Sequence, residues 1–491
     1  MTSPQTGVDQ ARLRGLGWNL NSPNDDGKIV IPAGFYGHTG YTGTSLWIDP
    51  ITQTFVIILT NRVYPNDKGD VAPLRSGIAD VVAAAIEHAD NTSVARADEP
   101  APQSTTTTAI TERPTVNSVR SGLDVLESEQ FAPLAGKRIG LITNHSGLDA
   151  RGRHSIELLQ HTPDVKLVAL FSPEHGLYGN VDAKVSSGVD SKTGLPIYSL
   201  YGKTLRPTPE MLQGVDALVF DIQDAGVRFY TYITTLAYTM EAAAQAGIDF
   251  YVLDRPNPIN ANLVQGPVLD NDMRSFTAYY PLPIRYGMTP GELALMFNHE
   301  NRIGAKLHVI KMAGYQRASW YDETGLQWVN PSPNLRSLTQ TALYPGVALI
   351  EGANVSVGRG TDSPFEMFGA PWINGKKLAD YLTKRKIPGV RFHAIRFTPS
   401  QNPYAKQHCD GVHVVLTDRE ALDAPALGVE ITAALHKFYP KKFQLGDTLG
   451  MIGKRSVIDA IREGEDPRAI VSQWHDPLAE FKQLRSKYLL Y

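Results

Sequence analysis

The sequence has a single cysteine, Cys409, among its 491 residues. One cysteine cannot form an intrachain disulfide, and it excludes a zinc site built from several cysteines. No stretch approaches the run of about 18 apolar residues that is typical of a membrane-spanning helix. We therefore expect no disulfide framework and no membrane span.

An excess of charge of either sign is also absent. The 47 Lys and Arg residues nearly balance the 50 Asp and Glu residues, and the formal net charge is −3. A nucleic-acid partner or an anionic membrane surface is therefore not expected. Residues 1–20 lack the basic start and apolar core of a signal peptide. The lack of disulfides fits the cytoplasm, and it fits a disulfide-free exported protein equally well.

Several catalytic motifs are missing. No G-x-G-x-x-G follows the first predicted strand, there is no P-loop, and the S-x-x-K of serine β-lactamases does not occur. Histidines and acids lie too far apart for a recognisable metal-binding pattern, although His145, His175 and Asp224 could meet in the fold. We predict no cofactor and no bound metal.

Residues 88–118 are rich in Thr, Ala, Pro and Glu and poor in large apolar residues. Such a segment cannot bury enough surface to fold, so it predicts a linker. The linker separates a front part, residues 1–87, from a back part that begins at residue 119. In the front part we expect two strands and a helix, at residues 45–49, 54–61 and 74–89.

The back part predicts an α/β domain at residues 119–365 and a smaller α+β domain at residues 366–491. Its strands are continuous apolar runs, which is typical of a parallel sheet covered on both faces. They are expected at residues 138–144, 165–171, 215–224, 248–254 and 306–312, and in the smaller domain at residues 390–397 and 411–417. Helices are expected at residues 153–161, 229–247, 289–300 and 424–438 and near the C-terminus.

Polar side chains follow four of the predicted parallel strands. Sites in open parallel sheets form outside the carboxyl ends of the strands, so we expect these side chains at one edge. Polar loops without a functional role are also common in α/β proteins. Here, however, polar side chains follow four strands, which favours a site. The residues are Asn144 after the first strand, Glu174 and His175 after the second, Asp224, Arg228 and Tyr230 after the third, and Asp254, Arg255 and Asn257 after the fourth.

A second dense stretch, residues 349–373, combines glycines with charged and aromatic side chains. Asn and Arg suit sugar hydroxyls and a carboxylate, and Trp suits the apolar face of a sugar. The alternative is a tight connection between domains with exposed charges. The candidates for sugar binding are Glu351, Asn354, Arg359, Thr361, Glu366 and Trp372. Without a cofactor motif, acid/base catalysis by carboxylates is the favoured chemistry, as in glycoside hydrolysis.

The motifs "GLITNHSG", "LFSPEHGLYG", "FDIQDAGVRFYTY", "LDRPNPI", "YPGVALIEGANVSVGRGTDSPFEMFGAPW" and "KYLLY" occur in this order. In these motifs the back part, about 117–491, resembles the exo-acting β-N-acetylmuramidases. The resemblance implies a Rossmann-like domain, a smaller C-terminal domain and a cleft between them. It also implies release of terminal N-acetylmuramic acid from the non-reducing end of peptidoglycan fragments. Glu174 falls on the glutamate proposed as catalytic in that family.

This resemblance suggests roles for the other candidates. His175 would orient Glu174 or share its proton, and Asp224, Glu351 or Glu366 would be the second carboxylate. The 2-acetamido group of the sugar could replace that carboxylate as an internal nucleophile. Arg228 or Arg359 would pair with the lactyl carboxylate of the muramic acid. The expected partner is a muropeptide or another peptidoglycan-derived saccharide, and the expected location is periplasmic or extracellular, with the cytoplasm as the alternative.

The front part resembles the last part of a serine β-lactamase-like hydrolase, through "GHTGYTGTSLWIDP" and "VIILTNRVYP". His38 begins an H-T-G where those enzymes carry K-T-G or H-T-G. The segments with the serine nucleophile and its base are missing, so we expect this part to be inactive. The same missing front would account for the missing signal peptide. Three alternatives remain: a remnant acyl-transfer hydrolase, a non-catalytic muramyl-sugar-binding protein and a NAD-type oxidoreductase.

Overall fold

The structure is a computed structural model of the chain. It describes residues 119–179, 184–401 and 403–491, and in the first 111 residues only 13–14, 19–20, 36–40, 43–49, 54–61, 71, 74 and 78. The chain divides into two units, residues 1–111 and 112–491.

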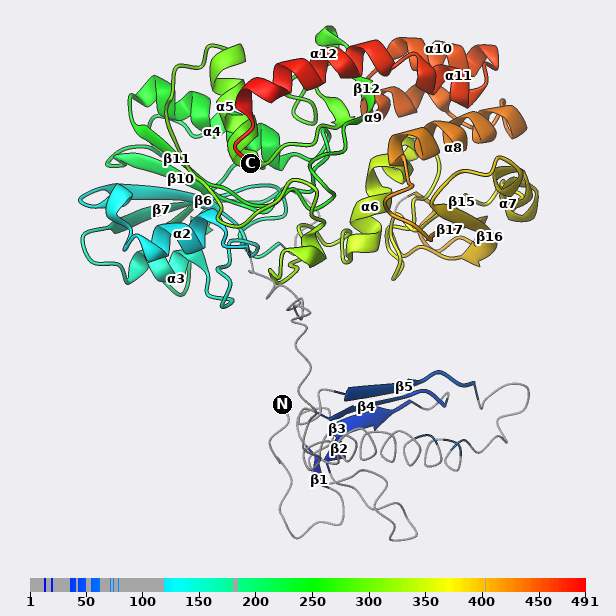
Figure 1. Cartoon of the computed structure of the whole chain (residues 1–491), viewed down its shortest axis with the longest axis horizontal. Coiled ribbons are helices and arrows are strands. Elements are labelled where there is room, and N and C mark those ends of the chain that lie inside the picture. The colour runs from blue at the N-terminus through cyan, green and yellow to red at the C-terminus, as the bar shows by residue number, and fades with distance from the viewer. Residues whose placement is uncertain are drawn as a thin grey trace, which may run out of the picture. The chain divides into compact units, whose positions relative to one another are not determined.

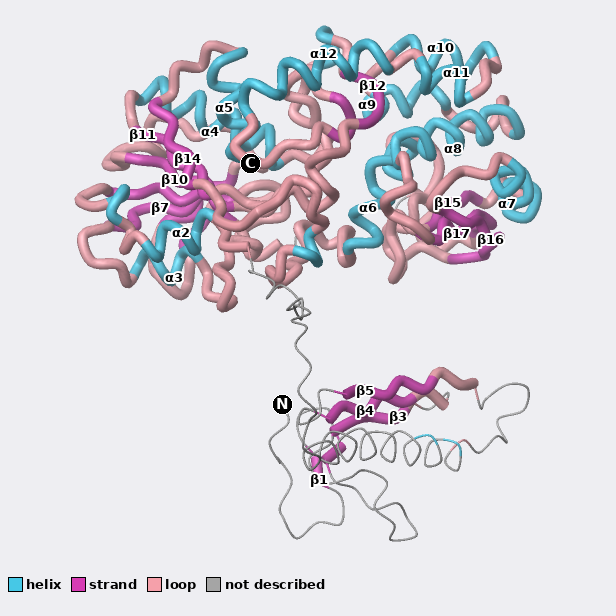
Figure 2. Tube along the Cα trace, viewed as in Figure 1, coloured by secondary structure: helices cyan, strands magenta, loops and turns pink. Residues whose placement is uncertain are grey.

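The first unit contains an antiparallel five-stranded sheet (Figure 2). Its strands, in spatial and chain order, are β1 (Leu13–Arg14), β2 (Asn19–Leu20), β3 (Tyr36–Thr39), β4 (Ser45–Asp49) and β5 (Thr54–Ile58). The two strands predicted in this part are β4 and β5, and they pair from Ser45 opposite Ile58 to Asp49 opposite Thr54. Most of the predicted helix at residues 74–89 and all of the predicted linker lie outside the described residues.

The second unit is built on a seven-stranded, mostly parallel sheet (Figure 1). Six parallel strands follow the chain order 3-2-1-4-5-6 across the sheet, which is the order of the Rossmann fold. They are β6 (Arg138–Thr143), β7 (Lys166–Ser172), β9 (Pro196–Ser199), β10 (Ala217–Asp221), β11 (Asp249–Leu253) and β14 (Lys306–Ile310). The edge strand β8 (Gly188–Val189) pairs antiparallel with β9. The predicted parallel sheet is thus confirmed, with β8 and β9 added.

Alternate side chains of these strands enter two different cores. Leu218 and Phe220 of β10 face the helices α4 (Tyr232–Ala246) and α5 (Pro290–Glu300). Ala217 and Val219 of the same strand belong to the opposite core, with α2 (Gly122–Ser128) and α3 (Ser155–Gln160). Burial on both faces explains why the strands read as continuous apolar runs.

The C-terminal part of this unit adds a small antiparallel sheet in the order β15-β17-β16, covered by helices. Its elements are α6 (Leu338–Val347), β15 (Met367–Ala370), α7 (Gly375–Lys384), β16 (Val390–Phe397), β17 (Cys409–Leu416), α8 (Ala424–Phe438), α9 (Leu449–Ile452), α10 (Arg455–Glu463), α11 (Pro467–Ser472) and α12 (His475–Arg485). A hairpin of β12 (Gln265–Val268) and β13 (Pro283–Arg285) lies between β11 and β14 along the chain. Short 3-10 helices occur at Ala132–Leu134, Asn271–Met273, Tyr321–Glu323, Ala348–Ile350, Leu445–Thr448 and Ser486–Tyr488.

Two glycines bring α6 and α8 together. A Cβ on Gly346 would lie 2.1 Å from the carbonyl oxygen of Ala424, and one on Gly428 would lie 2.5 Å from that of Gly346. No larger residue fits there without moving a helix. One continuous apolar core therefore runs from the face of the central sheet that carries α4 into the C-terminal part. This core fixes the two parts of the unit against each other.

The chain then returns to the central sheet. Helix α12 runs back from the C-terminal part (Figure 1), and Arg485 at its end donates to the carbonyl oxygens of Ala261 and Gly287. The hydroxyl of the last residue, Tyr491, donates to Asp254 at 2.8 Å and accepts from the Met312 amide at 2.8 Å. The tail "KYLLY" is therefore a structural element that ties the end of the chain to the carboxyl edge of the sheet.

Candidate active site

A cavity at the carboxyl edge of the central sheet is lined by residues from both parts of the second unit. The α/β part contributes Glu174, His175, Tyr201, Phe229, Tyr230, Thr231, Phe276 and Thr277. The remaining lining residues are Ser332, Asn334, Leu335, Tyr344, Glu351, Arg359, Phe365 and Met451.

Glu174 enters this cavity two residues after the end of β7. The next residue, His175, is buried and has a φ of 70°, a left-handed conformation that is unfavourable for any residue except glycine. Such strained conformations persist only where the surroundings hold them, and they concentrate at functional sites. The turn after β7 is therefore held in one conformation, which aims the Glu174 side chain at the cavity.

A hydroxyl holds the carboxylate of Glu174. Thr231 Oγ1 donates to Glu174 Oε2 at 2.6 Å, and Thr231 is itself nearly buried. The next residue, Tyr232, donates its hydroxyl to the carbonyl oxygen of Pro331 at 2.7 Å and accepts from Asn144 Nδ2 at 3.0 Å. Asn144 therefore does not line the cavity, but it supports the segment that carries Thr231.

The facing wall contains a charged pair. Arg359 Nη1 donates to Glu351 Oε1 at 2.5 Å, and both side chains are only partly exposed. Both residues were predicted as site residues. Phe365, with a φ of 62°, completes the loop that carries Arg359 around to the cavity. The cavity thus presents two carboxylates and one guanidinium among its described lining residues.

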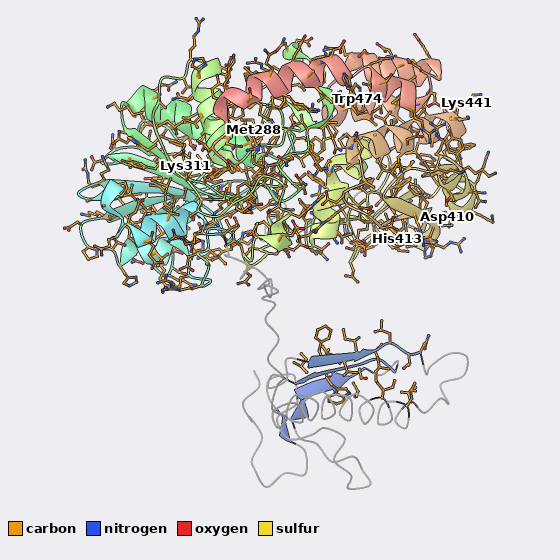
Figure 3. The ribbon with its side chains drawn as sticks, in the orientation of Figure 1. Met288, Lys311, Asp410, His413, Lys441 and Trp474 are labelled. Carbon is orange, nitrogen blue, oxygen red and sulfur yellow. The ribbon has the colours of Figure 1, made fainter. Side chains whose placement is uncertain are left out.

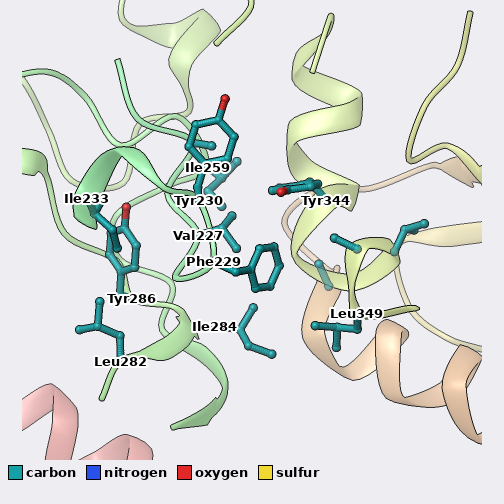
Figure 4. Close-up of a cluster of buried hydrophobic side chains, with 14 of the residues drawn as sticks. Val227, Phe229, Tyr230, Ile233, Ile259, Leu282, Ile284, Tyr286, Tyr344 and Leu349 are labelled. Atoms are coloured by element: carbon teal, nitrogen blue, oxygen red, sulfur yellow. The ribbon is translucent and has the colours of Figure 1, made fainter. Parts of the chain in front are cut away.

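Aromatic rings join the two walls. Tyr344 of α6 meets Phe229 edge to face at 5.3 Å between ring centroids and Phe365 at 4.6 Å. Figure 4 shows Phe229 and Tyr344 facing each other across the boundary between the two parts. Tyr230 lies edge to face against Tyr232 at 4.8 Å, and its burial raises the pKa of its hydroxyl well above the ordinary value. Tyr230 therefore stays protonated and can act only as a neutral hydroxyl.

Two candidates after β10 do not reach the cavity. The guanidinium of Arg228 is buried and donates to four backbone carbonyl oxygens, those of Pro267, Leu282, Met451 and Ile452. Its burial lowers its pKa to about 9. This corrects the expectation that Arg228 is available for the lactyl carboxylate, because its donors already serve the backbone.

Asp224 is also buried, and its Oδ2 accepts from the Tyr286 hydroxyl and from the Gly226 amide. Desolvation raises its pKa to about 6. A second carboxylate of a glycosidase has to face the sugar, and Asp224 faces the protein interior. The possibility that Asp224 meets His145 and His175 is not realised as a metal-binding group, because no three His, Cys, Asp or Glu side chains form one among the described residues.

The candidates after β11 are structural as well. Arg255 makes a buried ion pair with Asp221, with Nη2 at 2.6 Å from Oδ1. Asp254 accepts from Thr289, from the Gly291 amide and from Tyr491, and desolvation raises its pKa to about 7. Asn257 donates to the carbonyl oxygen of Met288. These side chains fix the loop after β11, and none of them lines the cavity.

The candidates in the loop at residues 349–373 also fall into two groups, those that line the cavity and those bonded within the protein. Glu351 and Arg359 line the cavity, whereas Asn354 bonds the backbone of Lys442 and Gln444. Three other candidates are also bonded within the protein and lie outside the cavity lining. Thr361 donates to the carbonyl oxygen of Gly358, Glu366 accepts from Gln340, and Trp372 donates to the Tyr404 hydroxyl.

The cavity includes residues that the sequence interpretation missed, chiefly Thr231, Tyr344, Tyr201 and Phe276. Thr231 and Tyr344 belong to the motifs "FDIQDAGVRFYTY" and "YPGVALIEG", so a fuller reading of those motifs would have included them. Tyr201 and Phe276 carry no such signal, because they lie in the loop after β9 and in the segment before β13, outside the motifs.

Comparison with known proteins identifies the family. Residues 139–339 match the family model of the N-terminal part of the exo-β-N-acetylmuramidase NamZ, and residues 342–491 match the model of its C-terminal part. The chain belongs to the exo-β-N-acetylmuramidase family. The resemblance stated from the motifs is thereby confirmed.

The peptidoglycan β-N-acetylmuramidase NamZ of Bacillus subtilis (strain 168) is a curated relative of this muramidase. It is 45% identical over 378 residues, which cover 76% of this chain and 91% of the relative. Two solved structures of DUF1343 family proteins from Bacteroides fragilis are also similar. They are 37% and 33% identical, with TM-scores of 0.71 and 0.64, and each comparison covers 76% of this chain and 99% of the other.

The front part has a separate relationship. Residues 1–80 match the β-lactamase family model, which confirms the second resemblance. His38 lies in β3, opposite Leu46 of β4. The expected lack of acyl-transfer activity stays a prediction. In the part of the chain that the structure describes, no helix is long and apolar enough to span a membrane.

Proposed function

We propose that this exo-β-N-acetylmuramidase uses Glu174 as the general acid when it releases terminal N-acetylmuramic acid from the non-reducing end of peptidoglycan fragments. The observation that carries the proposal is the position of the Glu174 carboxyl in the cavity, with Thr231 Oγ1 2.6 Å from Oε2. That bond leaves Oε1 as the oxygen that carries the catalytic proton to the glycosidic oxygen.

Glu351 is our candidate for the second carboxylate. Of the three residues considered for this role, it is the one that lines the cavity with Glu174. It would act as nucleophile, as base toward water, or as partner of the 2-acetamido group of the sugar, depending on its separation from Glu174 in the complex. The stereochemistry of the released sugar distinguishes inversion from the two retaining routes.

Arg359 is our candidate for recognition of the lactyl group. A guanidinium matches a carboxylate in charge and geometry, and Arg359 is the one Arg or Lys among the described lining residues. Its bond to Glu351 would orient both groups toward the sugar. Because peptidoglycan lies outside the cytoplasmic membrane, we propose a periplasmic or extracellular site of action.

The test is hydrolysis of para-nitrophenyl β-N-acetylmuramic acid by the wild type and by Glu174→Gln. Loss of the general acid should lower kcat by about 10²- to 10⁴-fold. Glu480→Gln, an exposed change on α12, is the matched control and should keep wild-type turnover. Near-normal turnover by Glu174→Gln would refute the assignment of the acid.

A second substrate tests the lactyl recognition. The wild type should release little nitrophenol from the N-acetylglucosamine analogue, which lacks the lactyl carboxylate. Arg359→Gln should reduce this preference for the muramide. Saturable binding of muramyl sugars by the wild type without any product would support the non-catalytic alternative.

A further inference from the structure

A second cavity lies beside the catalytic one at the same edge of the sheet. We call it the lysine pocket, and define it by Lys184, Ser186, Ser187, Ser199, Lys203 and Thr204. Its volume is about 690 Å³, within the range of about 300–1,000 Å³ that is common for ligand sites. Ser199 ends β9, which pairs with β7, the strand that leads to Glu174.

Two hydrogen bonds hold the walls of the lysine pocket together. The Val185 amide donates to the carbonyl oxygen of Tyr201 at 2.9 Å, and Ser187 Oγ accepts from the Ser199 amide at 3.1 Å. A Cβ on residue 202 would lie 2.4 Å from the carbonyl oxygen of Val185, so only Gly202 permits this approach. The pocket is therefore built before any ligand arrives.

Only a thin partition separates the lysine pocket from the catalytic cavity. Tyr201 lines the catalytic cavity, and the next residue, Gly202, lines the lysine pocket. On the other side, the Val185 side chain lies against Gly176, two residues after Glu174. Consecutive residues thus line the two cavities, so the lysine pocket is the neighbour of the catalytic cavity on the Tyr201 side.

The two cavities differ in charge. The catalytic cavity presents Glu174 and Glu351, whereas the described lining of the lysine pocket has Lys184 and Lys203 and no acidic side chain. Neither lysine is in an ion pair among the described residues. Two ammonium groups beside three serine hydroxyls suit a carboxylate.

The partition itself is aromatic. Tyr201 and Phe276 lie with ring centroids 5.9 Å apart, and both line the catalytic cavity and are partly exposed. Aromatic rings of this kind bury the apolar face of a sugar while leaving its hydroxyl groups free. This pair is suited to a sugar that carries no charge.

Peptidoglycan alternates a sugar without a carboxylate and a sugar with a lactyl group that ends in a carboxylate or a peptide. We propose that the lysine pocket binds the carboxylate of the second sugar of the leaving group, while Tyr201 and Phe276 hold the uncharged first sugar. The inference rests on the proposed function, because it places the terminal muramic acid in the catalytic cavity. It adds a subsite for the substrate beyond the bond that is cleaved.

The test compares two trisaccharides, N-acetylmuramyl-N-acetylglucosaminyl-N-acetylmuramic acid and its derivative in which the last lactyl group is a neutral amide. The wild type should have an about tenfold higher kcat/KM for the acid than for the amide, and added salt should reduce the difference. In the double variant Lys184→Gln and Lys203→Gln, the two trisaccharides should become equal. Both lysines are exposed, so the changes should leave the fold intact.

The matched control is Lys441→Gln, an exposed lysine on the C-terminal part (Figure 3). It should keep the wild-type preference for the acid. Equal kcat/KM values for acid and amide in the wild type, or an unchanged preference in the double variant, would overturn the lysine pocket as a subsite. Hydrolysis of the nitrophenyl muramide, which has no second sugar, reports on the proposed function alone and separates the two failures.

Discussion

Two regions at one edge of the same sheet contain similar residues but use them differently. The turn after β7 presents Glu174 to the cavity, where the Thr231 hydroxyl donates to its carboxylate. The segments directly after β10 and β11 turn Asp224, Arg228 and Asp254 inward, where each is hydrogen-bonded to other parts of the protein. Position after a strand thus predicts which residues gather at an edge, but not which of them face the ligand.

The difference is one of hydrogen-bond capacity. The Arg228 guanidinium donates four hydrogen bonds to backbone carbonyl oxygens. The Asp254 carboxylate accepts from both backbone amides and side-chain hydroxyls. Buried charged groups require such partners, so the inward-facing residues stabilise the loops that shape the cavity. Substitution of an inward-facing residue should therefore lower the free energy of unfolding, whereas substitution of a cavity-lining residue should lower kcat.

Arg228→Met should have the largest effect on stability. Methionine keeps much of the apolar volume but leaves four buried carbonyl oxygens without their donors. Each loss of this kind costs about 1–3 kcal/mol, so we expect the free energy of unfolding to fall by at least about 3 kcal/mol in urea titrations. The exposed change Arg151→Met should leave it unaltered. A stable variant with a strongly raised KM for the muramide would instead make Arg228 a substrate ligand.

Asp224→Asn should change how stability depends on pH. Burial raises the pKa of Asp224 from 3.8 to about 6, so the folded protein keeps this proton between pH 4 and 6 while the unfolded chain releases it. The free energy of unfolding therefore falls as the pH rises through this window, by about 2–3 kcal/mol for this group. Asp254 has a raised pKa of about 7, so it also lowers the free energy of unfolding as the pH rises, up to about pH 7.

Asparagine cannot ionise, and its oxygen can still accept from Tyr286 and Gly226. The variant should therefore gain stability relative to the wild type as the pH rises from 4 to 7, in urea titrations at several pH values. Its kcat should stay within a few-fold of the wild type. A fall of a hundredfold or more in a folded variant would make Asp224 the second carboxylate after all.

Tyr491→Phe tests the inward-facing region from the end of the chain. The change keeps the ring against Tyr315 but removes the hydroxyl that bridges Asp254 and the Met312 amide. We expect a loss of about 1–3 kcal/mol in unfolding free energy. Tyr488→Phe, whose hydroxyl bonds the side chain of Glu300 near the surface, should cost less. Wild-type stability of the Tyr491→Phe variant would show that this hydroxyl does not tie the end of the chain to the sheet.

The fold was largely predictable from the sequence because strands buried on both faces are continuous apolar runs. The short strands β8 and β9 at one side of the sheet lack such runs, since Gly188 and Val189 are exposed and β9 is only partly buried, and they were missed. For the site, the motifs located Glu174, Tyr230, Glu351 and Arg359. They could not separate these from Arg228 or Asp224, because burial and hydrogen-bond partners arise only when distant segments such as Met451 and Tyr286 come together.

The smallest expected effect lies where the two regions meet. Three residues after the buried Arg228, Thr231 faces the cavity and donates to Glu174. Thr231→Val keeps the shape but removes the donor, so the Glu174 carboxyl loses its fixed orientation. We expect kcat on the nitrophenyl muramide to fall about tenfold with KM nearly unchanged, because the bond positions the acid and does not touch the substrate. Thr231→Ser restores the hydroxyl and should recover most of the turnover. Wild-type kcat in the valine variant would mean that Glu174 is oriented by the turn around His175 alone, and the boundary between the structural and the catalytic region would then lie at the end of β7.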